Sequence, residues 1–296
     1  MRRLLHVGYY VHVFTRTSSD KWRLTDVLSD LNEHTVALCE EEKLKALIKE
    51  IRPDIIFHLA TSGVYGGVSS SEKELIETNF AGTVNLFNAC NDIDYKCFVN
   101  TSSSSEYGPK KHPMKETDVC EPITMYGITK CAATLYGSFL AKTKDKPILA
   151  CRLFSPFGPF DDKSRLVVYA IANALQNKDL NLGNPEAVRD YIYVEDVLDL
   201  YMKGIEKASE LKGEIFNVGS GSQTTIRHVV NRVIELTQSK SRVNWGAVKG
   251  RSWDTEKWEA NIEKTCKSFD WQPRYKIDEG LKRTISWFRS NLSSYT

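Results

Sequence analysis

Short apolar runs rich in β-branched and aromatic residues alternate along the chain with longer segments whose apolar residues recur at helical spacing. The runs predict strands at Tyr9–Thr15, Thr35–Leu38, Asp54–Ala60, Lys96–Thr101, Pro147–Leu153 and Glu214–Val218. The longer segments predict helices at Glu40–Ile51, Glu72–Asn91, Ile123–Ala141, Arg165–Gln176 and Val194–Lys207. Because strands and helices alternate, we expect the α/β class, with a doubly wound parallel sheet covered by helices on both faces.

The alternation ends after Val218. The pattern then predicts a helix over Thr225–Leu236, a polar stretch rich in Lys, Arg and Trp, and an amphipathic helix over Asp278–Ser290. We therefore expect a small C-terminal lobe rather than an independent domain. The sheet domain is assigned residues 1–154 and 190–220, and the lobe residues 155–189 and 221–296.

The start of the chain departs from the expected pattern. A doubly wound sheet usually opens with a hydrophobic strand, a glycine-rich turn and a helix, whereas residues 1–8 have the pattern of a helix end with Gly8 as its C-cap. The first strand and the glycine-rich loop are missing from the sequence. Either about 20 residues have been lost by truncation, or the protein has given up its phosphate-binding loop. We favour truncation because the other elements match their expected roles.

Composition narrows the class of protein. With 296 residues, of which 41% are hydrophobic, the chain is long enough to bury a sizeable core. The 40 basic and 38 acidic residues form no polybasic block, so we expect no nucleic-acid partner. No apolar run approaches the roughly 20 residues that span a bilayer, and residues near the N-terminus lack the apolar stretch of a signal peptide, so we expect no membrane association.

The seven cysteines are odd in number and form no CxxC pair. This argues against both a disulfide framework and a zinc site. We therefore expect no bound metal and a reducing compartment, with the cytoplasm as the default location.

Tyr126 and Lys130 lie four residues apart on a predicted helix, which places the phenol and the ammonium on one face. A nearby ammonium lowers the pKa of a tyrosine, and such a phenol can exchange a proton near neutral pH. The same spacing is also typical of an ordinary amphipathic helix with a solvated lysine. A serine cluster within Phe98–Gly108 favours the chemical interpretation, because it follows a strand at the edge where open α/β sheets bind ligands.

Ser103, Tyr126 and Lys130 resemble the catalytic triad of the extended short-chain dehydrogenase/reductase family. Four further segments are similar to family motifs: Asp54–Ala60, Asn79–Thr83, Arg152–Pro159 and Arg189–Asp196. The resemblance implies a Rossmann-like fold, a nicotinamide cofactor and a nucleotide-sugar substrate. It also implies that the nicotinamide passes Ala60 and that Tyr126 and Lys130 contact the cofactor, with Lys130 on the nicotinamide ribose. Family members commonly dimerise through the helices that carry the tyrosine and the lysine, so a homodimer is expected.

The same resemblance assigns substrate contacts. Arg189 and Arg251 would pair with the diphosphate of the nucleotide sugar, since a guanidinium can contact phosphate oxygens bidentately; the alternative is ordinary surface arginine. Trp253 and Trp258 could stack on a base or a sugar, or complete a small core. Three serines are also expected to contact the substrate: Ser104, Ser105 and Ser155.

The turn after the first predicted strand bears on the choice of cofactor. Family members that bind NAD usually end the corresponding strand with an acidic residue for the ribose hydroxyls, but this chain has Thr15 followed by Arg16 and a run of hydroxyl residues. A basic, hydroxyl-rich turn suits a 2′-phosphate. We therefore expect Arg16 to contact the cofactor and NADP(H) to be favoured over NAD(H), with a simple polar turn as the alternative.

The serine cluster also bears on the reaction. The 4,6-dehydratases of this family carry an Asp-Glu pair where this chain has Ser104 and Ser105, which argues against dehydration. Two reactions at C4 of the sugar stay open, reduction of a 4-keto sugar with NADPH and 4-epimerisation, and we favour the reductase. A non-catalytic nucleotide-binding protein that has lost its phosphate loop is the alternative of another class. The intact triad argues against it.

Overall fold

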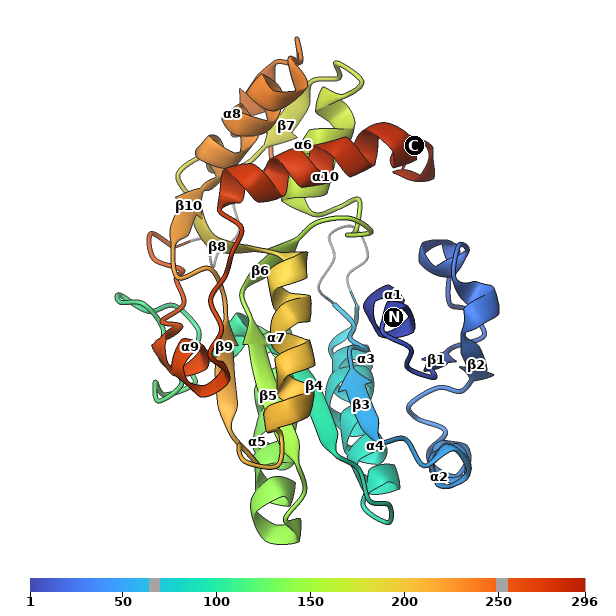
Figure 1. Cartoon of the computed structure of the whole chain (residues 1–296). Helices are drawn as coiled ribbons and strands as arrows, with labels where there is room; N and C mark the ends of the chain where they lie inside the picture. Colours follow the sequence, from blue (N-terminus) through green and yellow to red (C-terminus); the bar gives the residue numbers. More distant parts are fainter. Residues whose placement is uncertain (64–69, 249–254, 296) are drawn as a thin grey trace.

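Four parallel strands form the central sheet of the computed structural model, which describes residues 1–63, 70–248 and 255–295. The strand order is β3-β4-β5-β9, with bounds Ile55–His58, Cys97–Ser103, Ile148–Leu153 and Ile215–Val218 (Figure 1). Each of these strands overlaps a predicted apolar run. The parallel pairing confirms the expected α/β class.

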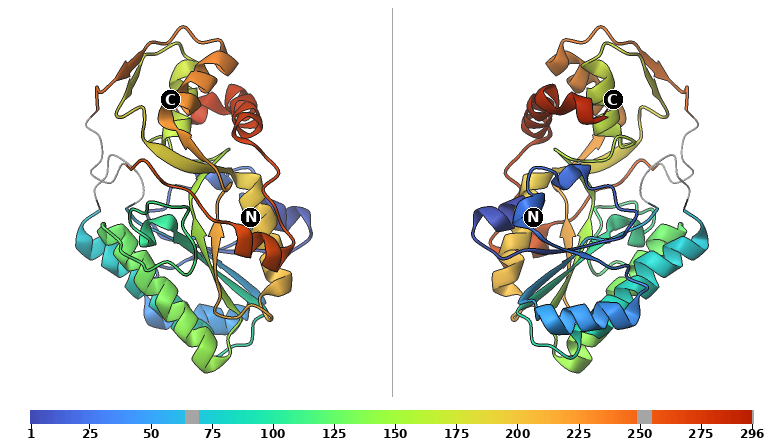
Figure 2. Two further views of the ribbon diagram at one scale, coloured as in Figure 1. Left: turned by 90° about the vertical axis from the view of Figure 1, so that its left-hand side faces the viewer. Right: turned by 90° about the vertical axis from the view of Figure 1, so that its right-hand side faces the viewer.

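Alternate residues of β4 enter two different cores. Phe98 packs with residues of α2 (Glu41–Ile51), α4 (Gly82–Cys90) and α5 (Met125–Lys144). Cys97 and Val99 pack on the other face, with α7 (Val194–Lys207) and α9 (Glu263–Phe269). Figure 2 shows α5 in green and α7 in gold on opposite faces of the sheet. A strand buried on both faces needs this two-sided helical cover.

The first two strands form a separate parallel pair, β1 (His12–Thr15) and β2 (Asn32–Thr35). The predicted second strand at Thr35–Leu38 was placed three residues too late, because Asn32–His34 is polar and has no apolar alternation. The start of the chain is helical, as expected: α1 (Arg2–His6) is followed by Gly8, whose φ of 85° suits glycine.

The predicted helix Glu72–Asn91 is three connected segments. A Ser71–Glu74 capping box starts α3 (Glu72–Leu75), the π-helical segment η3 (Ile76–Ala81) follows, and α4 completes the run. Hydrophobic periodicity does not distinguish a π-helical turn from an α-helical one, so the sequence could not predict the interruption.

A second group of elements forms the upper part of the molecule in Figure 1. Its small sheet has the order β10-β8-β6, and β7 pairs with β11. Three helices pack around a separate apolar cluster that includes Phe157, Ile171 and Phe288. The elements are β6 (Ser155–Phe157), β7 (Leu180–Leu182), β8 (Val188–Tyr193), β10 (Gln223–Thr225), β11 (Val243–Trp245), α6 (Leu166–Ala174), α8 (Ile226–Thr237) and α10 (Ile277–Asn291). The exact division into two domains stays a prediction.

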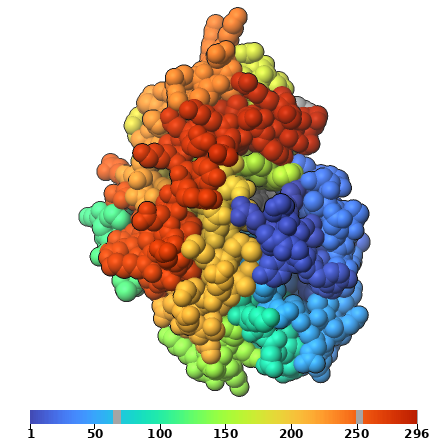
Figure 3. All heavy atoms as spheres, in the orientation of Figure 1, coloured from blue at the N-terminus to red at the C-terminus, as the bar shows by residue number. Residues whose placement is uncertain are grey.

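The N-terminal segment holds these parts together. Arg3 forms ion pairs with Glu195 and Asp199 of α7, and the blue segment lies against the gold helix in Figure 3. Arg23 donates a 2.7 Å hydrogen bond to the Phe160 carbonyl, which belongs to the upper part. No helix within the described ranges is long and apolar enough to cross a membrane.

Candidate active site

The serine cluster forms a turn at the carboxyl end of β4. The strand ends at Ser103, whose hydroxyl oxygen accepts a 3.1 Å hydrogen bond from the backbone N–H of Ser105 and so starts the 3₁₀ turn η4 (Ser104–Glu106). Gly108 closes the turn with a φ of 65°, and a Cβ there would lie 2.0 Å from the Glu121 carbonyl oxygen. Glycine is therefore required for the 109–124 loop to return against the turn.

Helix α5 starts directly on this serine turn. Thr124 is its N-cap, accepting a 3.1 Å hydrogen bond from the backbone N–H of Gly127. A Cβ on Gly127 would lie 2.5 Å from the Ser105 carbonyl oxygen, so only glycine permits this close approach. The helix residue next to Gly127 is Tyr126, and the packing therefore brings the first turn of α5 to the turn that bears Ser103.

Lys130 is held one helical turn further along α5. Its side chain is 3% exposed, and Nζ donates a 2.6 Å hydrogen bond to the Thr101 carbonyl oxygen of β4. Burial lowers the pKa of Lys130 to about 8, although the negative charge of Glu106 opposes part of this shift. Because this value lies above neutral pH, the side chain still carries its positive charge there, and a buried ammonium can lower the pKa of a nearby phenol.

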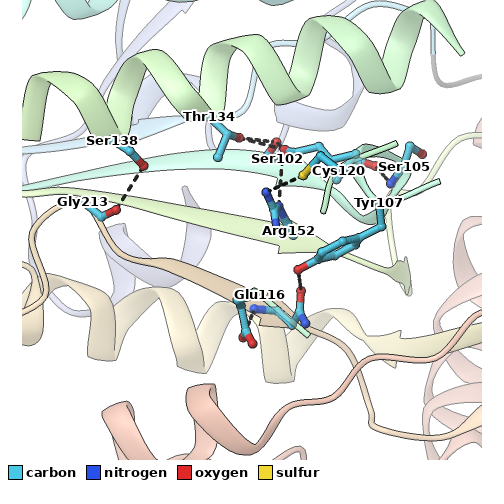
Figure 4. A network of polar contacts seen from close by, with 12 residues as sticks. Ser102, Ser105, Tyr107, Glu116, Cys120, Thr134, Ser138, Arg152 and Gly213 are labelled. Carbon is cyan, nitrogen blue, oxygen red and sulfur yellow. Dashed lines mark hydrogen bonds and ion pairs between the residues drawn. The ribbon is translucent and has the colours of Figure 1, made fainter. Parts of the chain in front are cut away.

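A buried ion pair lies beneath the serine turn. The Glu106 carboxylate is fully buried and accepts a 2.8 Å hydrogen bond from Arg152 Nε and another of 2.8 Å from the Thr134 hydroxyl. Ser102 donates a third hydrogen bond to the same carboxylate (Figure 4). The network joins β4, η4, α5 and β5. Sequence reasoning gave Glu106 and Arg152 no role, although a charged residue inside the apolar run 148–154 was a signal.

The π-helical segment positions Asn79 at the end of β3. Asn79 is fully buried, accepts a 2.8 Å hydrogen bond from the Ser62 N–H and donates one of 3.1 Å to the Ser62 carbonyl oxygen. This double contact fixes the backbone just after Ala60, which is exposed at the end of the strand. Interruptions of this kind frequently occur at functional sites. The sequence identified the Asn79 motif but not this role.

Trp258 connects the serine turn with the upper part of the molecule. Its indole N–H donates a 3.1 Å hydrogen bond to the Ser104 hydroxyl, and the Arg189 guanidinium lies 5.8 Å from its ring centre. Trp258 is buried with Tyr107 and Phe154, so it completes a small core. Ser155 opens β6, where it pairs with Tyr191 of β8. Two predicted site residues lie outside the described residues: Arg251 and Trp253.

The β1-β2 pair carries two charges relevant to a cofactor, Arg16 just after β1 and Glu33 on β2. Arg16 is exposed in the turn, which is closed by a 2.9 Å hydrogen bond from its backbone N–H to the Ser19 hydroxyl. The Thr15 hydroxyl donates a hydrogen bond to Glu33 of β2, and Glu33 forms an ion pair with Lys21. Sequence reasoning missed Glu33 because it examined the end of one strand and not the strand paired with it.

Comparisons with known proteins decide the family. A model of the NAD dependent epimerase/dehydratase family matches residues 1–219. The chain belongs to this family. The resemblance to extended short-chain dehydrogenases/reductases is thereby confirmed, as is the prediction of an enzyme.

The sequence similarity between this chain and known family members extends over most of both chains. The UDP-glucose 4-epimerase of Mycoplasma genitalium is 26% identical over 95% of this chain and 92% of its own. The dTDP-glucose 4,6-dehydratase 1 of Escherichia coli is 24% identical over 86% of this chain and 77% of its own. Both epimerases and dehydratases therefore occur among the relatives.

Solved structures confirm the Rossmann-like fold of this family member. The UDP-glucose 4-epimerase of Thermotoga maritima, solved with UDP-glucose, has a TM-score of 0.90 at 26% identity and covers 98% of this chain and 94% of its own. MoeE5, solved with UDP-glucose and NAD, has a TM-score of 0.86 at 26% identity, with coverage of 98% and 94%.

The buried Lys130 gives this family member a testable pH dependence. Below about pH 8 the folded protein carries a buried ammonium, and burying this charge destabilises the folded state. Because Lys130→Met removes the charge, we expect it to raise the free energy of unfolding at pH 7 by about 1–3 kcal/mol. Between about pH 8 and the ordinary lysine value of 10.5, the unfolded chain retains a proton that the folded chain has released. The stability of the wild type relative to the variant should therefore rise with pH across this window.

Urea unfolding of both proteins at pH 7 and at a pH above 9 measures this difference. Lys142→Met removes an exposed lysine from the same helix and is the matched control, for which no pH-dependent difference is expected. A Lys130→Met variant that is less stable than the wild type at pH 7 would contradict the effect of burial.

Proposed function

We propose that this chain is an NAD(P)-dependent oxidoreductase that acts at C4 of a nucleotide-linked hexose, as an NADPH-dependent 4-ketosugar reductase. Two contacts at the carboxyl edge of β4 support the proposal: Lys130 donates a hydrogen bond to the strand that ends in Ser103, and Gly127, next to Tyr126, packs on the serine turn. Ser104 and Ser105 in place of the acidic pair argue against dehydration. A 4-epimerase is the second candidate, favoured by the similarity to the UDP-glucose 4-epimerases.

The residues present fit both ends of a dinucleotide. Lys130 has three N–H donors, of which the Thr101 carbonyl takes one, so others can bind the nicotinamide ribose. Arg16 at the end of β1 is suited to the adenosine end, and Ala60 lies exposed two residues beyond β3. Within the described ranges, no glycine-rich turn joins a strand to a helix, so the fit is argued from these two ends alone.

The chain's own residues supply the proton chemistry. A bound nicotinamide supplies hydride transfer. Ser103 would orient the sugar oxygen through its hydroxyl, and Tyr126 would donate the proton that this oxygen gains on reduction. The ammonium of Lys130 would favour the phenolate that remains. Arg189 would bind the diphosphate through its guanidinium.

The preference for NADP(H) depends on two charges of the β1-β2 pair, Arg16 just after β1 and Glu33 on β2. Arg16 is exposed in the turn and forms no ion pair with another described residue, so its charge is available for a 2′-phosphate. Glu33 would repel that phosphate, but its ion pair with Lys21 neutralises much of the repulsion. Because Arg16 is the more exposed of the two groups, we infer that NADP(H) is favoured over NAD(H).

A direct assay separates the two candidate reactions. With a nucleotide-linked 4-keto-6-deoxyhexose, we expect one NADPH to be oxidised for each sugar reduced. We also expect the rate of oxidation to be higher with NADPH than with NADH. An epimerase would instead interconvert UDP-glucose and UDP-galactose without net consumption of cofactor. Saturable binding without either reaction would support the non-catalytic alternative.

Two variants serve as controls for this assay. Tyr126→Phe should abolish turnover while leaving cofactor affinity nearly intact, because it removes only the exchangeable proton. Arg16→Ala should weaken NADPH binding about 10-fold and leave NADH binding unchanged, since one charge-assisted hydrogen bond contributes roughly 1.5 kcal/mol. Equal loss of both cofactors in Arg16→Ala would contradict the role assigned to this residue.

We also propose a homodimer that uses α5. Ile128, Leu135 and Phe139 are 45%, 59% and 53% exposed and follow one another at helical spacing, and Ile76 of η3 is 44% exposed. Sedimentation of the wild type should give the mass of two chains, and sedimentation of Leu135→Asp should give the mass of one chain. A monomeric wild type at micromolar concentration would contradict the proposal.

We propose the cytoplasm as the location. All seven cysteines are free thiols, and two of them, Cys120 and Cys131, lie close enough for their thiols to interact. Thiols at such separation stay reduced in a reducing compartment.

A further inference from the structure

Two cysteines lie beside the buried ion pair under the serine turn. Cys120 belongs to the 109–124 loop, and Cys131 follows Lys130 on α5. Their sulfur atoms and a carboxylate oxygen of Glu106 all lie within 4.8 Å of one another. Arg152 Nη2 donates a 3.1 Å hydrogen bond to the Cys120 sulfur, as Figure 4 shows. The cluster has no part in the proton chemistry described above.

The charges of the cluster favour thiol chemistry over metal binding. Two sulfurs and a carboxylate could ligate a soft cation, but the Arg152 guanidinium is already hydrogen bonded to Glu106 and Cys120. A cation there would be repelled by Arg152, whereas a thiolate is stabilised by it. Hydrogen bonding with the Cys131 thiol lowers the pKa of Cys120 to about 7; burial opposes this shift, and the charge of Arg152 adds to it.

The other cysteines are less suited to this chemistry. Burial raises the pKa of Cys90 and of Cys97 to about 12, and it also raises the pKa of Cys151 and Cys266. Cys39 is exposed, but no cysteine partner is described beside it. Cys120 is partly exposed, so a small oxidant can reach its sulfur.

We propose that Cys120 and Cys131 form a disulfide in response to hydrogen peroxide and that this bond switches the enzyme off. The Cys120 thiolate attacks one peroxide oxygen, the O–O bond breaks, and the hydroxide that leaves takes up a proton to become water. The resulting sulfenic acid is attacked by the Cys131 sulfur. The S–S bond forms as the S–O bond breaks, and the departing hydroxide leaves as water with the Cys131 proton. The two thiols are oxidised by two electrons in total, and the peroxide is reduced to two waters.

The bond would disturb the active site through contacts already described. A disulfide brings two sulfurs to about 2.05 Å, so the loop must move toward α5. The backbone N–H of the adjacent Glu121 donates a hydrogen bond to the Tyr107 carbonyl oxygen, and the Glu121 carbonyl packs on Gly108. Movement of the loop is therefore transmitted to the turn that carries Ser103. The loss of turnover rests on the proposed function, whereas formation of the bond does not.

Peroxide treatment of the reduced full-length chain tests the proposal. We expect peptide mapping by mass spectrometry to identify a Cys120–Cys131 crosslink. Turnover should fall about 10- to 100-fold, because displacements of about 1 Å at a reacting centre have effects of this size, and a dithiol reductant should restore it. A crosslink between other cysteines, or oxidation of Cys39 while Cys120 and Cys131 stay reduced, would overturn the proposal.

Single variants separate the steps. Cys131→Ser should stop at a sulfenic acid on Cys120 that dimedone traps, and Cys120→Ser should form neither product and keep its turnover in peroxide. Cys266→Ser replaces another partly exposed thiol and is the matched control, which should behave like the wild type. If the crosslink forms but the reduced chain shows no turnover, the proposed function is contradicted and the disulfide proposal is not. If the reduced chain shows turnover but peroxide forms no crosslink, the disulfide proposal is contradicted and the proposed function is not.

Discussion

The buried ion pair between Glu106 and Arg152 is the interaction on which the active-site edge depends. Its two side chains are 0% and 2% exposed, so neither charge can be solvated by water. Leaving one of them unpaired in such surroundings costs about 3–5 kcal/mol. Ser102 and Thr134 satisfy further oxygen lone pairs of the carboxylate. β4, β5 and α5 are therefore fixed relative to one another before any ligand binds.

The rest of the site follows from this arrangement. Because α5 is fixed on β4, Lys130 contacts the strand that ends in Ser103, and Tyr126 lies on the first turn of the same helix. Trp258 then joins the serine turn to the part of the molecule that carries Arg189. The same Arg152 that neutralises Glu106 also donates a hydrogen bond to the Cys120 sulfur, so one guanidinium contacts both the buried carboxylate and the thiol of the proposed switch.

Long periodic segments were predictable from sequence, and contacts between distant residues were not. Helix α7 has the predicted bounds Val194–Lys207, because its apolar stripe is regular over fourteen residues. The strands β6, β7, β10 and β11 have three residues each, too few to show a period of two, and they were missed. The six-residue β8 was missed as well, because the charged pair Arg189-Asp190 interrupts its apolar pattern. The candidate triad was inferred from motif spacing within two short segments. Glu106 and Arg152 are 46 residues apart, and no local pattern links them.

A double-mutant cycle on the buried ion pair tests the account most directly. Urea unfolding would be measured for the wild type, Glu106→Gln, Arg152→Met and the double variant. Each single variant should lose about 3–5 kcal/mol because it leaves the other group unpaired, and the double variant should lose much less than the sum. Losses that add to within about 0.5 kcal/mol would contradict the claim that this pair fixes the active-site edge.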